Sequence, residues 1–374
     1  MRRPGPSSRG QGARQAPDAC LTVNLLPGPV KIHPSVRATF ARRSVSHRSR
    51  DFVHDFQEIR QRLCKLVNAS HVVVLLGSGT LANDAVAAQL SLARERGLIL
   101  RNGEFGERLV EQARRFGLSF KVLGSGWGRG LPYAKVRRIL GQDRSIRWLW
   151  AVHCETSTGV LNDLHRLKEL AGAADIRLCL DCISSIGTVP VDLERVHFAT
   201  GVSGKGLASY PGLSFVFHHH AIPASAVLPR YLDLGGYEES RGVPFTTSSN
   251  LVYALGQSLT RFGSSDGKGP SSPAAVYLAK AVLVRWLRPR LEALGLTILA
   301  PEAIASPAVM TLVLPGSLDS VRVGECLEAQ GFSLSYRSRY LVRRNLIQIC
   351  LMGKHTRREL SRLLQRLSEH RSSP

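Results

Sequence analysis

The sequence contains no long apolar segment and little cysteine. No apolar run reaches the roughly 18 residues that a membrane-spanning helix requires, and no apolar signal core follows the basic N-terminus. The seven cysteines are scattered from Cys20 to Cys350, unlike the dense disulfide framework of a small secreted protein. These absences predict a cytoplasmic protein in a reducing compartment, without a membrane partner.

Acidic residues are scarce relative to basic ones. The chain has 28 acidic and 50 basic side chains, which gives a formal net charge of +22. Such a charge attracts nucleic acid nonspecifically at low salt. The arginines are spread along the whole chain, however, with no RNA-binding signature, zinc finger or basic stripe interleaved with aromatics. We therefore expect no specific nucleic-acid partner.

Metal-binding patterns are incomplete. Cys179 and Cys182 form a CxxC motif, but no second ligand pair follows at zinc spacing. Three histidines at 218–220 follow a strand predicted over 214–217, and they lack a carboxylate companion in the sequence around them. We expect buried, inert thiols, a polar strand end and no metal site.

Composition divides the chain of 374 residues into four parts. Residues 1–19 are rich in Arg, Gly, Ser and Pro and predict a disordered basic tail. Residues 20–261 predict a large domain, 262–273 a flexible linker and 274–374 a small C-terminal domain. A chain of this length can bury enough apolar surface for such a pair of domains.

Apolar runs alternate with helical patterns in the large domain. Strands are predicted at 72–76, 148–152 and 178–180, and helices at 81–93 and 164–171. This alternation indicates an α/β fold with a mostly parallel sheet flanked by helices, and functional residues at the carboxyl ends of the strands. The small domain reads as α+β, with helices at 274–294, 321–330 and 357–368 and strands near 309–314 and 346–351.

Lys205 and Asp181 form the most informative pair in the chain. Lys205 is one of only nine lysines, against 41 arginines, and it lies among small residues in 199–208 (ATGVSGKGLA). Asp181 ends an apolar run 24 residues earlier. An aldehyde cofactor needs a lysine amine to hold it as a Schiff base and a carboxylate to keep its ring nitrogen protonated. The pair therefore predicts pyridoxal 5'-phosphate as cofactor.

Further motifs follow other predicted strands. Residues 77–80 (GSGT) stand between a strand and a helix, where backbone N–H groups suit a phosphate, although tight turns also need glycine. Phe105 stands among glycines in 102–108 (NGEFGER), where a planar ring could stack on it or where it could simply join the core. Hydroxyl-rich segments follow at 153–159 (HCETSTG) and 181–187 (DCISSIG).

These motifs, in this order, resemble those of the class V aminotransferases among the fold-type I pyridoxal phosphate enzymes. The most similar members are the alanine–glyoxylate, serine–pyruvate and 2-aminoethylphosphonate aminotransferases. The likeness extends to 25–30 (LLPGPV), 46–52 (SHRSRDF) and 244–250 (PFTTSSN). It implies a small-molecule amino donor, an oxo-acid acceptor and a homodimer with shared active sites.

The resemblance also assigns roles to single residues. Lys205 would be the Schiff-base lysine and catalytic base, and Asp181 the partner of the pyridine nitrogen. Pro27 and Gly28 would line the substrate pocket. The remaining cofactor-binding residues would be Phe105 on the ring, Ser78, Gly79, Thr80 and Ser203 at the phosphate, Thr156 at the ring hydroxyl and Thr246 from the neighbouring subunit.

One position departs from the family pattern. Gln348, in 346–353 (LIQICLMG), stands where relatives usually carry an arginine that clamps the anion of the substrate. Arg337 and Arg339 are candidate replacements, because alternation along a strand would place both on one face. Alternatively, the anion is absent from the substrate or bound elsewhere, and the two arginines belong to a solvated hairpin.

Two other function classes stay open. A non-transaminating enzyme of the same fold, such as a lyase or racemase, would use the same cofactor. Desulfuration is disfavoured, because Phe105 and Gly204 stand where desulfurases typically place histidines. A non-catalytic binding protein that kept the fold would not need Lys205 for its role.

Overall fold

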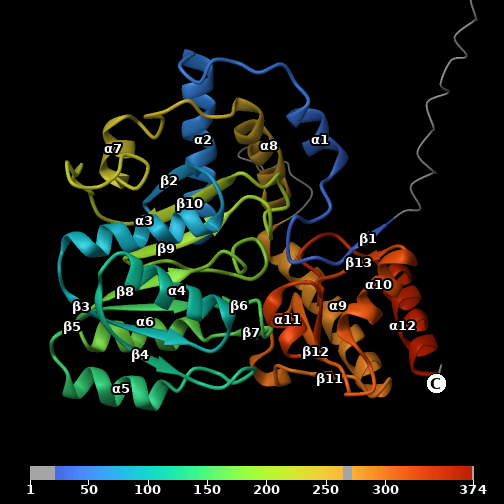
Figure 1. Ribbon diagram of the computed structural model, residues 1–374. Helices are drawn as coiled ribbons and strands as arrows, with labels where there is room; N and C mark the ends of the chain where they lie inside the picture. Colours follow the sequence, from blue (N-terminus) through green and yellow to red (C-terminus); the bar gives the residue numbers. More distant parts are fainter. Residues whose placement is uncertain (1–21, 264–271, 373–374) are drawn as a thin grey trace, which may run out of the picture.

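The computed structural model describes residues 22–263 and 272–372 (Figure 1). Its centre is a seven-stranded sheet with the order β2-β10-β9-β8-β5-β3-β4. The strands are β2 (His71–Leu76), β3 (Arg96–Arg101), β4 (Ser119–Gly124), β5 (Ile146–Val152), β8 (Arg177–Asp181), β9 (Phe198–Val202) and β10 (Leu213–His218). Strand β10 is antiparallel to both neighbours, and the other pairs are parallel. The predicted α/β fold with a mostly parallel sheet is confirmed.

Helices cover both faces of this sheet. One face packs against α2 (Arg50–Val67), α5 (Tyr133–Gln142), α6 (Leu164–Ala173) and α8 (Ser249–Leu259). The other packs against α3 (Gly79–Leu92), α4 (Glu104–Arg115) and α7 (Leu234–Glu239). Because both faces are buried, the central strands contain continuous apolar stretches rather than an alternating pattern. The short helix α1 (Pro34–Phe40) packs against α8.

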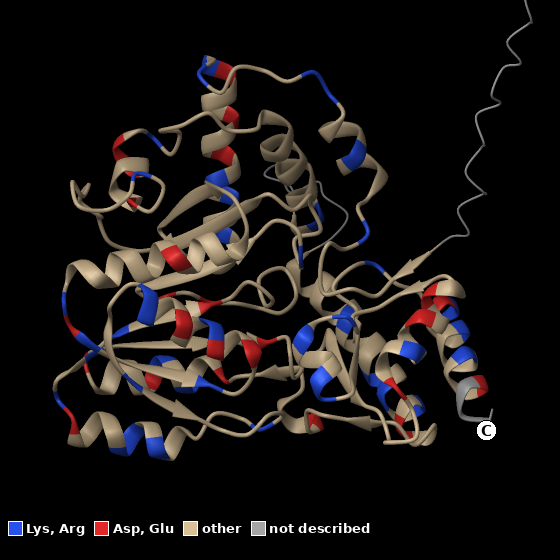
Figure 2. Ribbon diagram, viewed as in Figure 1, with Lys and Arg blue, Asp and Glu red and all other residues tan. Residues whose placement is uncertain are grey.

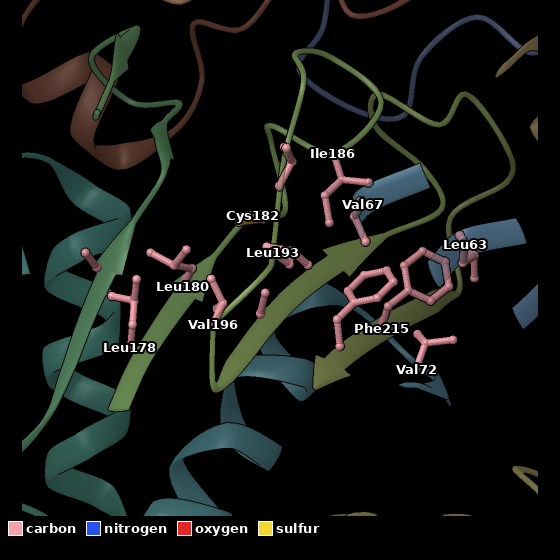
Figure 3. Close-up of a cluster of buried hydrophobic side chains, with 14 of the residues drawn as sticks. Leu63, Val67, Val72, Leu178, Leu180, Cys182, Ile186, Leu193, Val196 and Phe215 are labelled. Carbon is pink, nitrogen blue, oxygen red and sulfur yellow. The ribbon is translucent and has the colours of Figure 1, made fainter. Parts of the chain in front are cut away.

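Strand β2 shows how one apolar run serves two cores. Val72 joins the cluster that includes Leu63 and Val67 of α2, whereas Val73 joins the cluster on the opposite face. Figure 3 shows Leu63, Val67 and Val72 beside Phe215 of β10. Successive side chains of a strand point to opposite faces, so a run of valines supplies both layers.

The C-terminal part of the chain has its own apolar core. Its elements are α9 (Pro273–Ala293), β11 (Thr297–Ile298), the 3-10 turn at Glu302–Ile304, β12 (Val309–Val313), α10 (Ser320–Ala329), β13 (Phe332–Ser333), α11 (Arg339–Arg343), β14 (Leu346–Cys350) and α12 (Arg357–Ser372). Strands β11, β12 and β14 form an antiparallel sheet. The predicted smaller α+β unit is therefore present beside the large sheet.

The N-terminal strand belongs to this C-terminal part. Strand β1 (Val23–Asn24) pairs in parallel with β13, so the start of the described chain lies against the red C-terminal elements in Figure 1. The domain boundaries at 20–261, 262–273 and 274–374 stay predictions. The predicted tail at 1–19 and residues 264–271 of the predicted linker lie outside the described residues, and the 3-10 turn at Thr260–Phe262 leads into the linker.

Basic side chains lie on helices of both parts of the molecule. Figure 2 shows Lys and Arg on α5 below the large sheet, and on α9 and α12 in the C-terminal part, where acidic residues lie among them. Within the described ranges, no helix combines the length and the apolar character needed to cross a bilayer.

Candidate active site

Segments that follow strands of the large sheet meet at one cavity of about 440 Å³. Strands β5, β8 and β9 are adjacent and parallel, so their carboxyl ends bring Thr156, Asp181 and Lys205 to the same edge of the sheet. The starts of two helices complete the wall, and they supply Ser78, Gly79, Thr80 and Phe105. Motifs far apart in the sequence therefore share one cavity.

Lys205 extends into the cavity from the loop after β9. Its amine donates a hydrogen bond to Ser184 Oγ at 3.0 Å and lies 5.4 Å from the centre of the Phe105 ring. Burial lowers the pKa of Lys205, and the nearby carboxylate of Asp181 opposes this effect in part. A lowered pKa favours the neutral amine, which can attack a carbonyl or accept a proton.

Asp181 is a buried carboxylate with fixed orientation. Its Oδ2 accepts a hydrogen bond from Asn83 Nδ2 and its Oδ1 from the backbone N–H of Ile183, each at 2.9 Å. Asn83 is oriented in turn, because Thr200 Oγ1 donates to Asn83 Oδ1 at 2.8 Å. Burial raises the pKa of Asp181, and the two hydrogen bonds oppose this. A cationic group in the cavity would stabilise the charged form.

Helix α3 begins at the cavity without a capping side chain. Its N-cap residue, Ser78, makes no side-chain hydrogen bond to the first turn. The carbonyl of Thr80 accepts a hydrogen bond from Gln112 Nε2 at 3.1 Å, which ties the start of α3 to the last turn of α4. A Cβ atom at Gly79 would lie 2.5 Å from Ile183 Cδ1, so a larger residue would force the Ile183 side chain to shift. The positive end of α3 suits an anion such as a phosphate.

Phe105 is held at the cavity by a buried carboxylate. Glu155 accepts hydrogen bonds from the backbone N–H groups of Phe105 at 3.3 Å, Gly106 at 2.9 Å and Ser157 at 3.2 Å. The Ser157 hydroxyl donates a fourth hydrogen bond to it at 2.5 Å. Two of these donors belong to the first turn of α4, whose N–H groups have no partner within the helix. Glu155 thus fixes the start of α4 and the position of the Phe105 ring.

Two further predicted residues lie at the cavity. Thr156 Oγ1 shares a hydrogen bond with Ser184 Oγ. Gly28 lines the wall next to Lys205, because a Cβ atom there would lie 3.2 Å from Lys205 Cγ, and its φ of +159° also favours glycine. Pro27 is not among the lining residues, whereas Pro29 is.

Ser203 and Thr246 do not face this cavity. The Ser203 hydroxyl donates to the carbonyl of Tyr210 at 2.6 Å and accepts from the backbone N–H of Leu213 at 3.3 Å, so it fixes the loop after β9. Thr246 is exposed on the segment before α8. The role of Ser203 at a phosphate and that of Thr246 in a neighbouring subunit stay predictions.

Gln348 is fully buried behind the cavity wall. Its Nε2 donates to the carbonyl of Thr156 at 2.5 Å and to Thr311 Oγ1 at 2.9 Å. Its Oε1 accepts from the Tyr340 hydroxyl at 3.1 Å. The amide is thus engaged by protein groups and does not line the cavity. A substrate-binding role for Gln348 stays a prediction.

Arg337 and Arg339 do not share a strand face, so that expectation is wrong. Arg337 lies on an irregular segment, ion-pairs with Glu328 at 2.7 Å and stacks on Tyr336. Arg339 is exposed and begins helix α11. Because a helix begins at Arg339, the two arginines do not alternate along a strand, as a shared face would require. Neither side chain lines the cavity.

Sequence reasoning missed three residues that organise the site: Asn83, Glu155 and Ser184. Glu155 and Ser184 lie inside the motifs at 153–159 and 181–187. The sequence therefore indicates their place near the site but not the groups to which they hydrogen-bond. Asn83 lies one helical turn after Thr80, on the side of α3 that faces the sheet. A buried asparagine in an otherwise alanine-rich helix was the available signal, because buried amides need hydrogen-bond partners.

The histidines at 218–220 have the carboxylate companion that the sequence did not reveal. His218 Nε2 lies 3.0 Å from Glu238 Oε1 of α7. In the part of the chain that the structure describes, no three His, Cys, Asp or Glu side chains are arranged to hold a metal ion. Cys179 and Cys182 are both buried and free, and burial raises the pKa of each thiol.

A family model for class-V aminotransferases matches residues 35–231, which is more than half of the chain. The chain belongs to the class-V aminotransferase family. Within this family, a 2-aminoethylphosphonate–pyruvate transaminase from Pseudomonas fluorescens is 30% identical over 276 residues, covering 70% of this chain and 73% of that one. A protein from Anabaena cylindrica named soluble hydrogenase 42 kDa subunit is 32% identical over 315 residues, 80% of each chain.

The fold agrees with solved structures of class-V aminotransferases. The alanine–glyoxylate aminotransferase from Nostoc sp. superposes with a TM-score of 0.82 at 27% identity, covering 97% of this chain and 99% of that one. The fold-type I architecture expected from the sequence is therefore shown.

Proposed function

We propose that this protein is a pyridoxal phosphate-dependent aminotransferase that attaches its cofactor at Lys205. It would move an amino group from a small donor to an oxo acid. The observation that carries the proposal is one cavity that contains the Lys205 amine, the buried Asp181 carboxylate and the uncapped start of α3. When bound, the cofactor supplies an aldehyde for the amino group and a protonated ring that accepts negative charge.

The residues of the cavity fit this cofactor chemically. The N-terminus of α3 at Ser78, Gly79 and Thr80 would hold its phosphate, and Phe105 would stack on its ring. Asp181 would hold a proton on the ring nitrogen, and Asn83 would keep that carboxylate aligned. Thr156 would contact the ring hydroxyl.

Lys205 would act as the base of the reaction. Its lowered pKa favours the neutral amine, which is the form that can accept a proton. In this role, Lys205 Nζ removes a proton from the Cα atom of the donor. The same amine later returns a proton when the oxo acid receives the amino group.

Arg108 is the side chain of the cavity best placed to meet an anionic donor. The lining carries three basic side chains and three acidic ones, namely Lys205, Arg108, Arg115, Asp84, Glu111 and Asp181. Arg108 stacks on Phe105 at 4.9 Å and therefore lies beside the ring that Lys205 approaches. The relative that acts on 2-aminoethylphosphonate makes aminophosphonates candidate donors, together with ordinary amino acids such as alanine.

An absorbance titration tests the proposed function. Purified protein with added pyridoxal phosphate should give a band near the visible edge, which one donor of a panel converts to the band of the aminated cofactor. Lys205→Ala should lack the band, whereas Lys135→Ala, an exposed lysine on α5, should keep it. A donor consumed without formation of the aminated cofactor would instead indicate a lyase or racemase. Absence of any band from the wild type would contradict the proposal.

A further inference from the structure

Ser184 lies in the cavity on the loop that follows β8. It comes three residues after Asp181, and its side chain is only 3% exposed. The backbone N–H of Ile183 donates to Asp181 Oδ1 at 2.9 Å, and that of Ile186 donates to the carbonyl of Cys182 at 3.0 Å. These hydrogen bonds fix the turn, and the turn fixes the direction in which the Ser184 hydroxyl points.

The Ser184 hydroxyl connects Lys205 to Thr156. Lys205 Nζ donates to Ser184 Oγ at 3.0 Å, and the Ser184 and Thr156 hydroxyls share a second hydrogen bond. Thr156 is itself fixed, because its carbonyl accepts from Gln348 Nε2. Over residues 22–263 and 272–372, the bond to Ser184 is the one hydrogen bond that the Lys205 amine makes to a side chain. A neutral hydroxyl on a rigid turn therefore holds this amine.

A hydroxyl suits an amine that must exist both with and without its extra proton. Ser184 has one proton to donate and two lone pairs that accept, so it can bond to a charged ammonium or to the lone pair of a neutral amine. A carboxylate at this distance would instead hold the amine in its charged form. Hydrogen bonds are stronger when one partner is charged, so the bond to Ser184 favours the ammonium form moderately.

We propose that Ser184 is a catalytic residue whose hydroxyl orients the Lys205 amine and stabilises its protonated form. The inference rests on the proposed function, in which Lys205 Nζ is the reacting atom. Its neighbour Ser185 provides a matched control. The Ser185 hydroxyl is fully buried, donates to the carbonyl of Cys182 at 3.2 Å and does not line the cavity.

Competitive labelling of the cofactor-free protein measures the effect on the amine directly. Acetic anhydride acetylates neutral amines, so the labelling of the Lys205 peptide against pH, followed by mass spectrometry, gives its titration midpoint. In Ser184→Ala the midpoint should fall by about one pH unit, the equivalent of one hydrogen bond to a charged group. Ser185→Ala should keep the wild-type midpoint, and Ser184→Thr, which retains a hydroxyl, should restore it.

The cofactor-loaded protein provides a second readout. The visible absorbance of protein incubated with pyridoxal phosphate is titrated with pH, and the midpoint should be displaced in Ser184→Ala but not in Ser184→Thr or Ser185→Ala. Ser184→Cys has a similar volume and only a weak hydrogen-bonding group, so it should show the same displacement if the alanine variant unfolds.

The outcomes separate the two proposals. If Ser184→Ala and Ser184→Cys titrate like the wild type in both measurements, the role of Ser184 is overturned and the aminotransferase proposal stands. If the labelling midpoint shifts but the wild type gives no visible band, the proposed function is overturned, and with it the catalytic role of Ser184.

Discussion

Asn83 has two buried hydrogen bonds that align the carboxylate of Asp181. In Asn83→Ala, Asp181 Oδ2 loses its donor and the Thr200 hydroxyl loses its acceptor. A hydrogen bond to a charged group contributes about 1.5–3 kcal/mol, so we expect the affinity for pyridoxal phosphate to fall about 10- to 100-fold. Equilibrium titration of the cofactor-free protein measures this. Thr200→Val removes only the outer bond and should have a smaller effect; equal affinities in wild type and Asn83→Ala would contradict the role of Asn83.

Three residues that the sequence placed at the site lie at the carboxyl end of a strand of the large sheet or in the segment just after it. Lys205, Asp181 and Phe105 could be found because parallel strands bring their carboxyl ends together, whatever the detail of the loops. The orientation of a side chain within a loop is not encoded in spacing. Ser203 therefore lies close to the site in sequence while its hydroxyl faces the loop backbone, and Ser184 was passed over although it reaches Lys205.

Helix α4 depends on a carboxylate from another element. We expect Glu155→Gln to lower the free energy of unfolding by about 1–3 kcal/mol, because an amide offers one acceptor oxygen where the carboxylate offers two. Thermal unfolding of the variant measures the loss. Glu107→Gln is the matched control, since Glu107 lies on the same helix, is 43% exposed and pairs with Arg101. Equal unfolding temperatures for Glu155→Gln and the wild type would contradict this account of α4.

Lys280 of α9 donates to the carbonyl of Gly187, just beyond Ser184, at 3.1 Å and is 3% exposed. Burial, assisted by the charge of Arg261, lowers the pKa of Lys280 from its ordinary 10.5 to about 7. Between these values the unfolded chain binds more protons than the folded one. Stability from this group therefore rises with pH over that window, by at most about 1.4 kcal/mol per unit.

Lys280→Met removes this titration. In denaturant unfolding at pH 7, 8 and 9, we expect the stability of the wild type relative to Lys280→Met to increase with pH. The comparison isolates Lys280, because both proteins retain Lys205 and the other titratable groups. A difference that stays constant with pH would show that Lys280 keeps its ordinary pKa.

Regular elements with a strong pattern could be predicted from the sequence, and short ones could not. The strand predicted at 72–76 and the helix at 81–93 correspond to β2 and α3, since burial on both faces gives a continuous apolar run and an uninterrupted helical pattern. Strands of two residues, such as β1 and β13, have no detectable period, and their pairing depends on distant partners. Helix α11 has only five residues, which is too short to show a helical period, and the predicted strand alternation of Arg337 and Arg339 is therefore wrong.

At the level of the whole molecule, the position of Thr246 bears on subunit organisation. It is exposed and outside the cavity of its own chain, as a residue that reaches a neighbouring active site would be. If sites are shared in a homodimer, a mixed dimer of inactive Lys205→Ala and inactive Thr246→Glu has one site with both native residues. Subunit exchange in an equal mixture should therefore make about a quarter of all sites intact. Transaminase assays before and after exchange measure this. If native mass spectrometry shows that mixed dimers have formed but no transaminase activity returns, the sites are not shared.

Covalent attachment of the cofactor to Lys205 is tested most directly by borohydride reduction followed by peptide mapping. Protein incubated with pyridoxal phosphate, reduced and digested should carry the added mass on the Lys205 peptide alone. Lys280 is an internal comparison, because it is also a buried lysine with a lowered pKa but lies outside the cavity lining. Modification at Lys280 or at exposed lysines, with the Lys205 peptide unchanged, would contradict the assignment of the active site.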